Sequence, residues 1–514
     1  MYNTEAILQG LQALLTFEVL LFLMLGFLIG FVVGAIPGFN DANLMAILLP
    51  FTLLLKPEVA IVSMAAIYAA AQAAGSIPAI LMNIPGTQGN AASTIEGYAL
   101  AKKGRAGYAL GIAFGASSFG AFLGAILAFG LAPVLGLFAL RFGPAEMFLL
   151  AVLGITVVSS LAGNDMIKGL LVAGFGVLLS MIGADDMAGF ARATYSIDFL
   201  YDGLPLIPVL LGLFAIPELV AMIKMKAIAS TQSASSRGWS EIISGVKVGL
   251  GQGQKVNLTR SSVLGYIVGV IPGAGATIGS FLAYGQARQW SRNKKAFGTG
   301  TEEGLVATES ANNATAAGAM VPTLTLGLPG SASTLVMLAC LYLHGVNPGP
   351  AFFMDFQVQA YTILLSLFIL PFLLLIFGVI LAKYAQKIVF IPTYYLIPIV
   401  TVLVFIGAYA WRFMAFDIIL MLIFGLIGIL LKRGGYPIPV LLLAIILGPM
   451  LESEFIRALA IDGYYSFIKT PISLVLLFII SLSLLAPLIL NVLTKKSKMA
   501  HDALKFEEET NAKL

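Results

Sequence analysis

Two acidic residues lie inside apolar stretches of this sequence, where a carboxylate is unusual. Asp41 stands in IPGFNDANL, and Glu309 stands in TESANNATAAG. An acidic residue at membrane depth is expensive and usually functional, so either could ligate a coupling cation or carry a proton. Glu309 has a second explanation, because a Glu near the start of a helix is favourable in itself. We expect ion coupling at Asp41, keep both explanations for Glu309, and add Asn312 and Asn313 as ion-coupling candidates.

Four Pro-Gly pairs interrupt apolar runs: Pro37-Gly38, Pro85-Gly86, Pro272-Gly273 and Pro329-Gly330. Proline removes a backbone donor and glycine permits unusual backbone angles, so each pair ends a helix. The backbone groups left unpaired at such a break cannot face lipid, and must be buried in protein or line a wet cavity. Paired breaks in two halves of a transporter point to its substrate site. The alternative is a set of simple proline kinks tolerated by packing.

Polar residues accompany the breaks, and we predict that they bind substrate together with the Pro-Gly pairs. They are Asn40, Asn43, Ser76, Asn83, Thr87, Gly275, Thr277, Ser331 and Ser333. None of the four blocks contains Lys or Arg, but the N–H groups at helix N-termini can hold an anion such as a carboxylate. Carbonyl and side-chain oxygens suit sodium. The alternative for the Asn, Ser and Thr residues is hydrogen bonding between packed helices.

The elements that must position these residues are membrane helices. Of 514 residues, 59% are apolar and only 11% are charged, and the mean hydropathy is +0.97. This composition excludes a soluble enzyme, a nucleic-acid binder and a secreted disulfide scaffold. We predict an all-α polytopic membrane protein with roughly ten to twelve spans plus broken or re-entrant segments. A single cysteine, two histidines and the lack of ATP-binding motifs predict no cofactor and no metal beyond transient sodium.

An internal duplication is visible in the two kinds of Pro-Gly block. GFVVGAIPGF at 30–39 returns 235 residues later as GYIVGVIPGA, and GSIPAILMNIPGT at 75–87 returns 244 residues later as AMVPTLTLGLPGS. Basic residues follow the second block of the first copy but the first block of the second copy: Lys102, Lys103 and Arg105, then Arg288, Arg292, Lys294 and Lys295. Because basic loops stay in the cytoplasm, this pattern predicts two repeats of inverted topology.

The pattern divides the chain into five parts. We expect a first repeat at 1–223, a polar cytoplasmic linker at 224–260, a second repeat core at 261–356, largely supporting helices at 357–493 and a cytoplasmic tail at 494–514. The linker is basic, and a docking surface for a partner is its alternative role. The N-terminus lacks the features of a cleaved signal peptide, so we expect the first apolar segment to stay as a helix.

Several of these motifs resemble those of the large membrane subunit of the tripartite tricarboxylate transporters, the TctA family. They are GAIPGF at 34–39, GSIPAILMNIPGT at 75–87, GYALAKKGRAG at 97–107, GVIPGAGATIGSFLAY at 269–284, ESANNA at 309–314 and LTLGLPGS at 324–331. The resemblance implies a multi-pass protein of the bacterial inner membrane that imports a di- or tricarboxylate, driven by a sodium or proton gradient. It also implies two partners, a small four-helix membrane subunit (TctB-like) and a periplasmic substrate-binding protein (TctC-like).

Two other functions stay open at this point. One is a passive anion channel, and the other is an intramembrane enzyme that uses Asp41 and Glu309 as acid and base. The carried carboxylate, the coupling ion and the oligomeric state are not specified by the residues.

Overall fold

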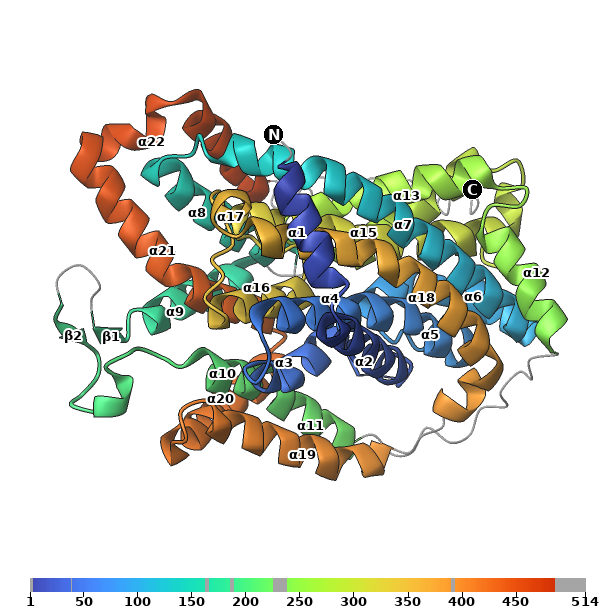
Figure 1. Ribbon diagram of the computed structural model, residues 1–514, viewed down its shortest axis with the longest axis horizontal. Coiled ribbons are helices and arrows are strands. Elements are labelled where there is room, and N and C mark those ends of the chain that lie inside the picture. Colours follow the sequence, from blue (N-terminus) through green and yellow to red (C-terminus); the bar gives the residue numbers. More distant parts are fainter. Residues whose placement is uncertain are drawn as a thin grey trace, which may run out of the picture.

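The protein is an assembly of helices in the computed structural model, which describes residues 3–37, 39–161, 166–184, 189–224, 238–389 and 393–485. The strands in this part of the chain are β1 (Gly183–Ala184) and β2 (Ala191–Arg192), which form a small antiparallel hairpin at the periphery (Figure 1). Seven helices are long and apolar enough to cross a membrane, counted over the described residues. The all-α polytopic fold is therefore confirmed, and ten to twelve crossings stays a prediction.

The helices of the N-terminal part are α1 (Thr4–Leu14), α2 (Phe17–Gly34), α3 (Asp41–Thr52), α4 (Pro57–Ala74), α5 (Ser76–Met82), η1 (Gln88–Ala91), α6 (Ser93–Lys102), α7 (Ala106–Ala139), α8 (Pro144–Leu161), α9 (Met166–Ser180), η2 (Asp198–Leu200), α10 (Leu206–Leu210), η3 (Leu211–Ala215) and α11 (Ile216–Lys224).

The helices of the C-terminal part are α12 (Trp239–Gly249), α13 (Lys255–Val270), α14 (Gly275–Trp290), η4 (Lys294–Ala296), α15 (Glu302–Leu326), α16 (Ala332–Leu343), α17 (Phe352–Asp355), α18 (Gln357–Val389), α19 (Thr393–Ala410), α20 (Ala415–Arg433), α21 (Ile438–Asp462), η5 (Gly463–Tyr465) and α22 (Ser466–Lys469). A short apolar helix at Pro471–Leu485 follows.

Each Pro-Gly pair lies between two helices, as predicted. The chain leaves α2, α5, α13 and α15 and re-enters helix at α3, η1, α14 and α16. Gly273 has φ +75°, a left-handed conformation that glycine adopts without strain, and a Cβ there would lie 2.9 Å from the Val158 side chain. Gly38 lies outside the described residues.

Glycines bring two pairs of helices into backbone contact. A Cβ on Gly30 of α2 would lie 2.5 Å from the Ile67 carbonyl oxygen of α4, and a Cβ on Gly265 of α13 would lie 2.4 Å from that of Ala311 of α15. These two contacts keep the offsets of 235 and 244 residues found in the sequence blocks. The same close backbone contacts recur one helical turn later, where Gly34 meets Ala71 and Gly269 meets Thr315. Helix α2 therefore packs against α4 in the same way as α13 packs against α15.

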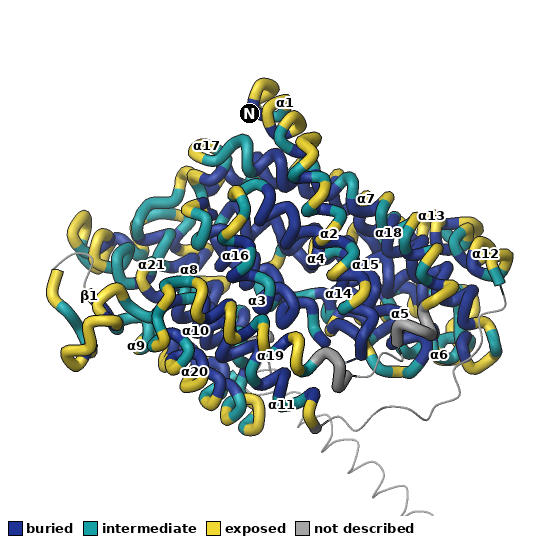
Figure 2. Tube along the Cα trace, turned by 60° about the horizontal axis from the view of Figure 1, so that its bottom comes forward, coloured by how far each residue is buried: buried dark blue, intermediate teal, exposed yellow. Residues whose placement is uncertain are grey.

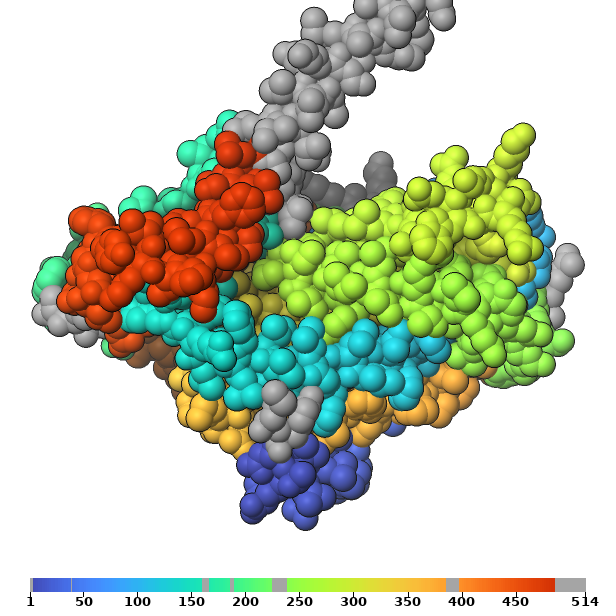
Figure 3. Space-filling model, turned by 90° about the horizontal axis from the view of Figure 1, so that it is seen from above, coloured from blue at the N-terminus to red at the C-terminus, as the bar shows by residue number. Residues whose placement is uncertain are grey.

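The helices that lead into the second break of each repeat, α4–α5 and α15, lie at the centre of the molecule. The α4–α5 segment is almost completely enclosed, with 94% of its apolar window buried, and Figure 2 shows α4 and α15 in the dark, buried interior. Helix α7 packs against both α12 and α13, and these elements form one continuous face (cyan and yellow-green in Figure 3). Large apolar side chains on the outside, such as Phe372 and Ile376 of α18, are more than half exposed, as expected for lipid-facing positions.

The loops after the breaks associate in two groups. Glu96 of α6, the helix after the first repeat's second block, accepts hydrogen bonds from the backbone N–H groups of Gly298, Gly300 and Thr301, at 2.5, 2.7 and 2.8 Å. These bonds hold the loop after α14 beside α6. The other two loops meet elsewhere, where Gln359 donates to Glu58 at 2.9 Å and His344 lies 3.2 Å from the Thr52 hydroxyl. The basic residues predicted to be cytoplasmic belong to the first group.

Candidate functional site

A cavity of about 290 Å³ lies among the segments that contain the Pro-Gly pairs. We call it the central cavity. It is lined by Asn40, Asp41, Gln72, Gln88, Gly89, Val158, Gly273, Ala274, Gly275, Ala276, Thr277, Ile278, Pro329, Ser331, Ala332, Ser333, Leu335, Pro439 and Leu443. Eight of these residues were predicted from the sequence: Asn40, Asp41, Gly273, Gly275, Thr277, Pro329, Ser331 and Ser333.

Four helix starts face this cavity, one after each break. The Asn40 side chain caps α3 by accepting from the N–H of Ala42 at 3.1 Å, and Ser331 caps α16 through a reciprocal pair of bonds with Thr334. The start of α14 has no side-chain cap, and its first three residues all line the cavity. Helix starts present N–H groups and partial positive charge. The helix starts therefore contribute N–H groups and partial positive charge to the cavity wall, and no Lys or Arg is among its lining residues.

Asp41 is the charged residue of the cavity wall. It is the first residue of α3 and is only 4% exposed. Its Oδ2 accepts hydrogen bonds from Gln72 Nε2 at 2.9 Å and from Ser333 Oγ at 2.7 Å. Helices from both halves of the chain therefore converge on one carboxylate oxygen, because α4 supplies Gln72 and α16 supplies Ser333.

A chain of buried polar groups leads from Asp41 to Glu309. Gln72 Oε1 lies 2.9 Å from the Thr87 hydroxyl, which lies 2.6 Å from Asn90 Oδ1. Asn90 Nδ2 donates to Glu309 at 3.3 Å. The other Glu309 oxygen accepts from Ser117 at 3.0 Å, and Glu309 is fully buried.

The structure excludes one of the two explanations of Glu309. Helix α15 begins at Glu302, so Glu309 lies two turns inside the helix and does not belong to its first turn. A favourable N-terminal position therefore does not explain this residue. It faces η1 and α7 through Asn90 and Ser117, and it is not among the residues that line the central cavity.

The remaining predicted residues lie at different distances from the cavity. Thr87 and Asn312 are one hydrogen bond away, since both contact Gln72: Thr87 through its hydroxyl and Asn312 through Nδ2, which donates to the Gln72 carbonyl at 3.2 Å. Asn312 Oδ1 is buried and has no hydrogen-bond partner among the described residues. A Cβ on Gly89 would overlap this oxygen, so Asn312 lies directly behind the cavity wall.

Several predicted residues do not line the cavity. Asn83 is exposed and lines a separate cavity with Tyr98, Lys102 and Lys103. Ser76, the first residue of α5, donates to the carbonyl of Ala73 in α4, and Asn313 donates to the carbonyl of Glu309 in its own helix, α15. The others outside the lining are Pro37, Asn43, Pro85, Gly86, Pro272 and Gly330, of which Gly86 bonds to the Gly75 carbonyl at 3.1 Å.

Gln72 and Gln88 line the cavity but were not among the predicted site residues, and Glu96, which lies outside the lining, was not predicted either. Gln72 connects Asp41, Thr87 and Asn312, and Glu96 fastens the loop after α14. A signal for Gln72 was present, because it is the one polar residue in the alanine-rich run AAAQAA. Glu96 gave no comparable signal, because it lies in a stretch where polar and charged residues are common.

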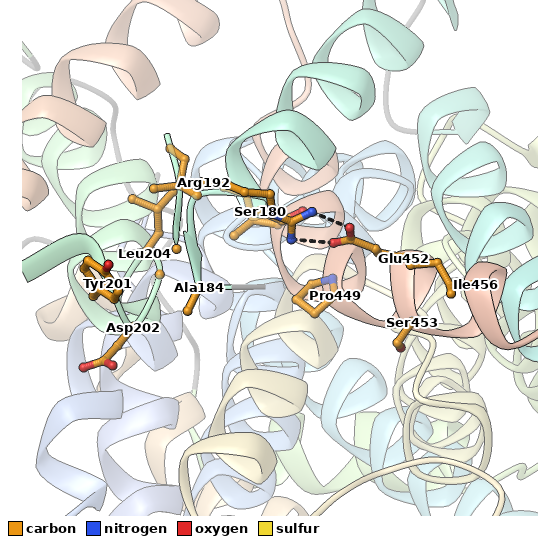
Figure 4. Close-up of a pocket in the computed structure, with 14 residues that line it drawn as sticks. Ser180, Ala184, Arg192, Tyr201, Asp202, Leu204, Pro449, Glu452, Ser453 and Ile456 are labelled. Atoms are coloured by element: carbon orange, nitrogen blue, oxygen red, sulfur yellow. Dashed lines mark hydrogen bonds and ion pairs between the residues drawn. The ribbon is translucent and has the colours of Figure 1, made fainter. Parts of the chain in front are cut away.

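A second cavity, of about 440 Å³, lies at the β-hairpin and away from the Pro-Gly segments (Figure 4). Arg192 of β2 donates to both carboxylate oxygens of Glu452 on α21, at 2.5 and 2.9 Å. This two-pronged ion pair ties the hairpin to α21. None of the predicted substrate residues lines this cavity.

Comparison with known proteins places the chain in a family. Residues 20–443 match the model described as "Tripartite tricarboxylate transporter TctA family". The chain is 32% identical over 498 residues to the "Uncharacterized 52.8 kDa protein in TAR-I ttuC' 3'region" of Agrobacterium vitis, an alignment that covers 95% of this chain and 97% of that protein. It is 34% identical over 198 residues, 38% of this chain and 82% of the relative, to the "Uncharacterized protein in TAR-II ttuC' 3'region" of the same organism. The chain therefore belongs to the tripartite tricarboxylate transporter TctA family.

Proposed function

We propose that this protein is a secondary active transporter subunit that imports a small di- or tricarboxylate through the central cavity. The observation that carries the proposal is the convergence of four helix starts on one enclosed cavity whose lining has no Lys or Arg. N–H groups from several helices can share two carboxylates of one substrate. Membership of a transporter family agrees with this function.

We further propose that the two halves are inverted repeats that alternate access around this cavity. The proposal is supported by the matched glycine contacts of α2 with α4 and of α13 with α15. It is also supported by the loops, since the loop after the second block of one repeat lies with the loop after the first block of the other. Inverted repeats that meet at a midplane site are common in secondary transporters.

The cellular setting is part of the proposal. We expect the protein in the bacterial inner membrane, with a cytoplasmic C-terminus, working with a TctB-like membrane subunit and a TctC-like periplasmic binding protein. The basic group of loops at Lys102 and Lys294 supports a cytoplasmic location for that side. A sodium or proton gradient is the proposed driving force.

Uptake of labelled di- and tricarboxylates into proteoliposomes, with and without a sodium or proton gradient, tests this function. We expect accumulation of an unaltered carboxylate above its external concentration, which a passive channel cannot produce and an enzyme would not leave unaltered. Collapse of the gradient with an ionophore is expected to abolish accumulation. Equilibration without accumulation would contradict the proposal and favour the channel.

Two variants connect transport to the cavity. We expect Ser331→Val and Thr87→Val to abolish uptake while membrane expression is retained, because each replaces a hydroxyl at or next to the cavity with a methyl group. Ser331→Val also adds apolar volume to the cavity wall. Ser244→Val is the matched control, since Ser244 is exposed on α12, far along the chain from every break. Unchanged uptake kinetics in both cavity variants would exclude these residues from the transport path.

A further inference from the structure

We propose that Arg260 of α13 and Trp290 of α14 form a binding site for the phosphate of an anionic phospholipid, whose acyl chains lie on the exposed apolar side chains of the same two helices. The site is separate from the central cavity, because it lies toward the ends of α13 and α14 that are remote from the break between them. It faces the side of the basic loops, since Trp290 is the last residue of α14 and the loop at Lys294 follows. The inference does not depend on the proposed transport.

Arg260 interrupts an apolar stripe on the outside of α13. Residues 256, 260, 263 and 267 follow one another at steps of four, three and four, which places them on one face of the helix. Val256, Val263 and Ile267 are 75%, 36% and 55% exposed, and α13 belongs to the outer face seen in Figure 3. Exposed apolar side chains of a membrane helix face lipid. Arg260 therefore lies within a lipid-facing stripe, about 7.5 Å along the axis from Lys255 at the start of the helix.

The Arg260 guanidinium has no anionic partner among the described residues. It lies over the Trp290 ring, 4.5 Å from the ring centroid, and its Nη2 donates to Asn257 Oδ1 at 3.1 Å. Its Nε is buried and has no hydrogen-bond acceptor in the part of the chain that the structure describes. A guanidinium carries five N–H donors in a planar fork that matches phosphate oxygens. A lipid phosphate would supply both the missing acceptors and the missing negative charge.

The position of the pair is that of lipid headgroups. Tryptophan favours the boundary between membrane and water, and the Trp290 side chain is 63% exposed. A second pair of this kind occurs where Lys383 of α18 lies over Trp239 of α12, 4.7 Å from the ring centroid. The cytoplasmic leaflet carries anionic lipids that attract basic residues at this level. Arg260 adds a hydrogen-bonding fork that can hold one phosphate at two points, which a lysine cannot.

The two helices also leave buried polar atoms without partners. These atoms are Ser261 Oγ and Tyr266 Oη of α13, and Ser280 Oγ and Gln286 Oε1 of α14, counted over the described residues. Unsatisfied polar groups weaken the packing of the helices that carry them. A lipid in contact with both helices therefore stabilises a pair whose own contacts are incomplete, and it holds α14, whose first residues line the central cavity.

Tryptophan fluorescence of the full-length protein in phosphatidylcholine vesicles tests the site. Trp239→Phe and Trp411→Phe leave Trp290 as the only tryptophan, and phospholipids with brominated acyl chains quench it on contact. We expect brominated phosphatidylglycerol to reach Trp290 with about tenfold higher affinity than brominated phosphatidylcholine. In Arg260→Gln this preference is expected to disappear. Arg292→Gln removes the same charge from the exposed loop after α14, and as the matched control it is expected to keep the preference.

Excess inorganic phosphate serves as a competitor and is expected to leave the quenching unchanged, because free phosphate lacks acyl chains. Equal affinity for the two brominated lipids, or a preference that survives in Arg260→Gln, would overturn the site. An equal loss in Arg292→Gln would show a general attraction to the basic loops instead. Removal of the preference by inorganic phosphate would show a site for the free anion.

Two further measurements keep the outcome unambiguous. If Arg260→Gln is not recovered as a single species, Arg260→Lys decides, because it keeps the charge without the planar fork and is expected to reduce the preference about threefold. An unchanged preference in Arg260→Lys would then contradict two-point binding of the phosphate. Carboxylate uptake by the same single-tryptophan protein is measured separately: its absence removes the proposed function and leaves the lipid site.

Discussion

At the scale of single residues, the sequence indicated polar groups in apolar surroundings but not the direction in which each side chain points. Asp41, Thr277, Ser331 and Ser333 were identified because a Pro-Gly break lies within five residues of each. Asn312 and Asn313 are neighbours in one helix, so they point about 100° apart. Asn312 reaches the cavity wall, and Asn313 does not. That difference depends on how α15 is rotated in its packing, which a local pattern cannot specify.

Glu309 permits a prediction at this scale. In Glu309→Ala the donors of Asn90 and Ser117 lose their acceptor and a cavity remains, so we expect a loss of about 2–4 kcal/mol in unfolding free energy. Glu309→Gln keeps the shape and one acceptor oxygen, and it is expected to lose much less. Thermal unfolding of both purified variants measures the difference. Equal stability of Glu309→Ala and the wild type would contradict the hydrogen-bonding role.

Glu96 gives a second residue-scale prediction. Its carboxylate accepts from three backbone N–H groups of residues 298–301, so Glu96→Ala is expected to release this loop. Limited trypsin digestion detects the release as faster cleavage after Lys294 and Lys295, which are already exposed. Glu303→Ala, beside the loop but outside this set of bonds, is the control. Cleavage at the wild-type rate in Glu96→Ala would show that other contacts hold the loop.

At the scale of elements, the breaks were predictable because the conformations of proline and glycine are local properties. The repeated blocks also predicted which segments are equivalent. Helix packing was less accessible, since close contact of α2 with α4 depends on glycines whose partners lie about 37 residues away. The convergence of four helix starts on one cavity likewise follows from tertiary packing, and the sequence predicted the starts but not their common position.

The glycine contacts predict the effect of added volume. Gly30→Ala and Gly265→Ala place a methyl group within 2.5 Å of a partner carbonyl, so the packed helices must separate. We expect each to lower stability by about 1–3 kcal/mol, measured by thermal unfolding. In Gly130→Ala the new methyl group meets no atom within 4 Å, and this control is expected to be as stable as the wild type or slightly more so. If all three variants unfold at the same temperature, the close packing of these helices is contradicted.

At the scale of the whole molecule, the proposed inversion assigns the two groups of loops to opposite sides of the membrane. In a Cys340→Ala background, Lys102→Cys is expected to react with an impermeant maleimide only from the cytoplasmic side, and Lys56→Cys only from the other side. Labelling of inverted and right-side-out vesicles measures this. Reaction of both positions from the same side would contradict the inverted repeats and the alternating access based on them.

The most direct measurement is protection of the central cavity by its substrate. In the Cys340→Ala background, Ala276→Cys introduces a thiol into the cavity wall, whereas Asn83→Cys introduces one into the separate cavity beside Lys102. The rates at which a small thiol reagent modifies both are compared with and without a panel of carboxylates in sodium buffer. We predict that at least one carboxylate slows modification at position 276 severalfold and leaves position 83 unaffected. If no carboxylate changes the rate at position 276, or if both positions are slowed alike, the central cavity is not where this protein binds an anion.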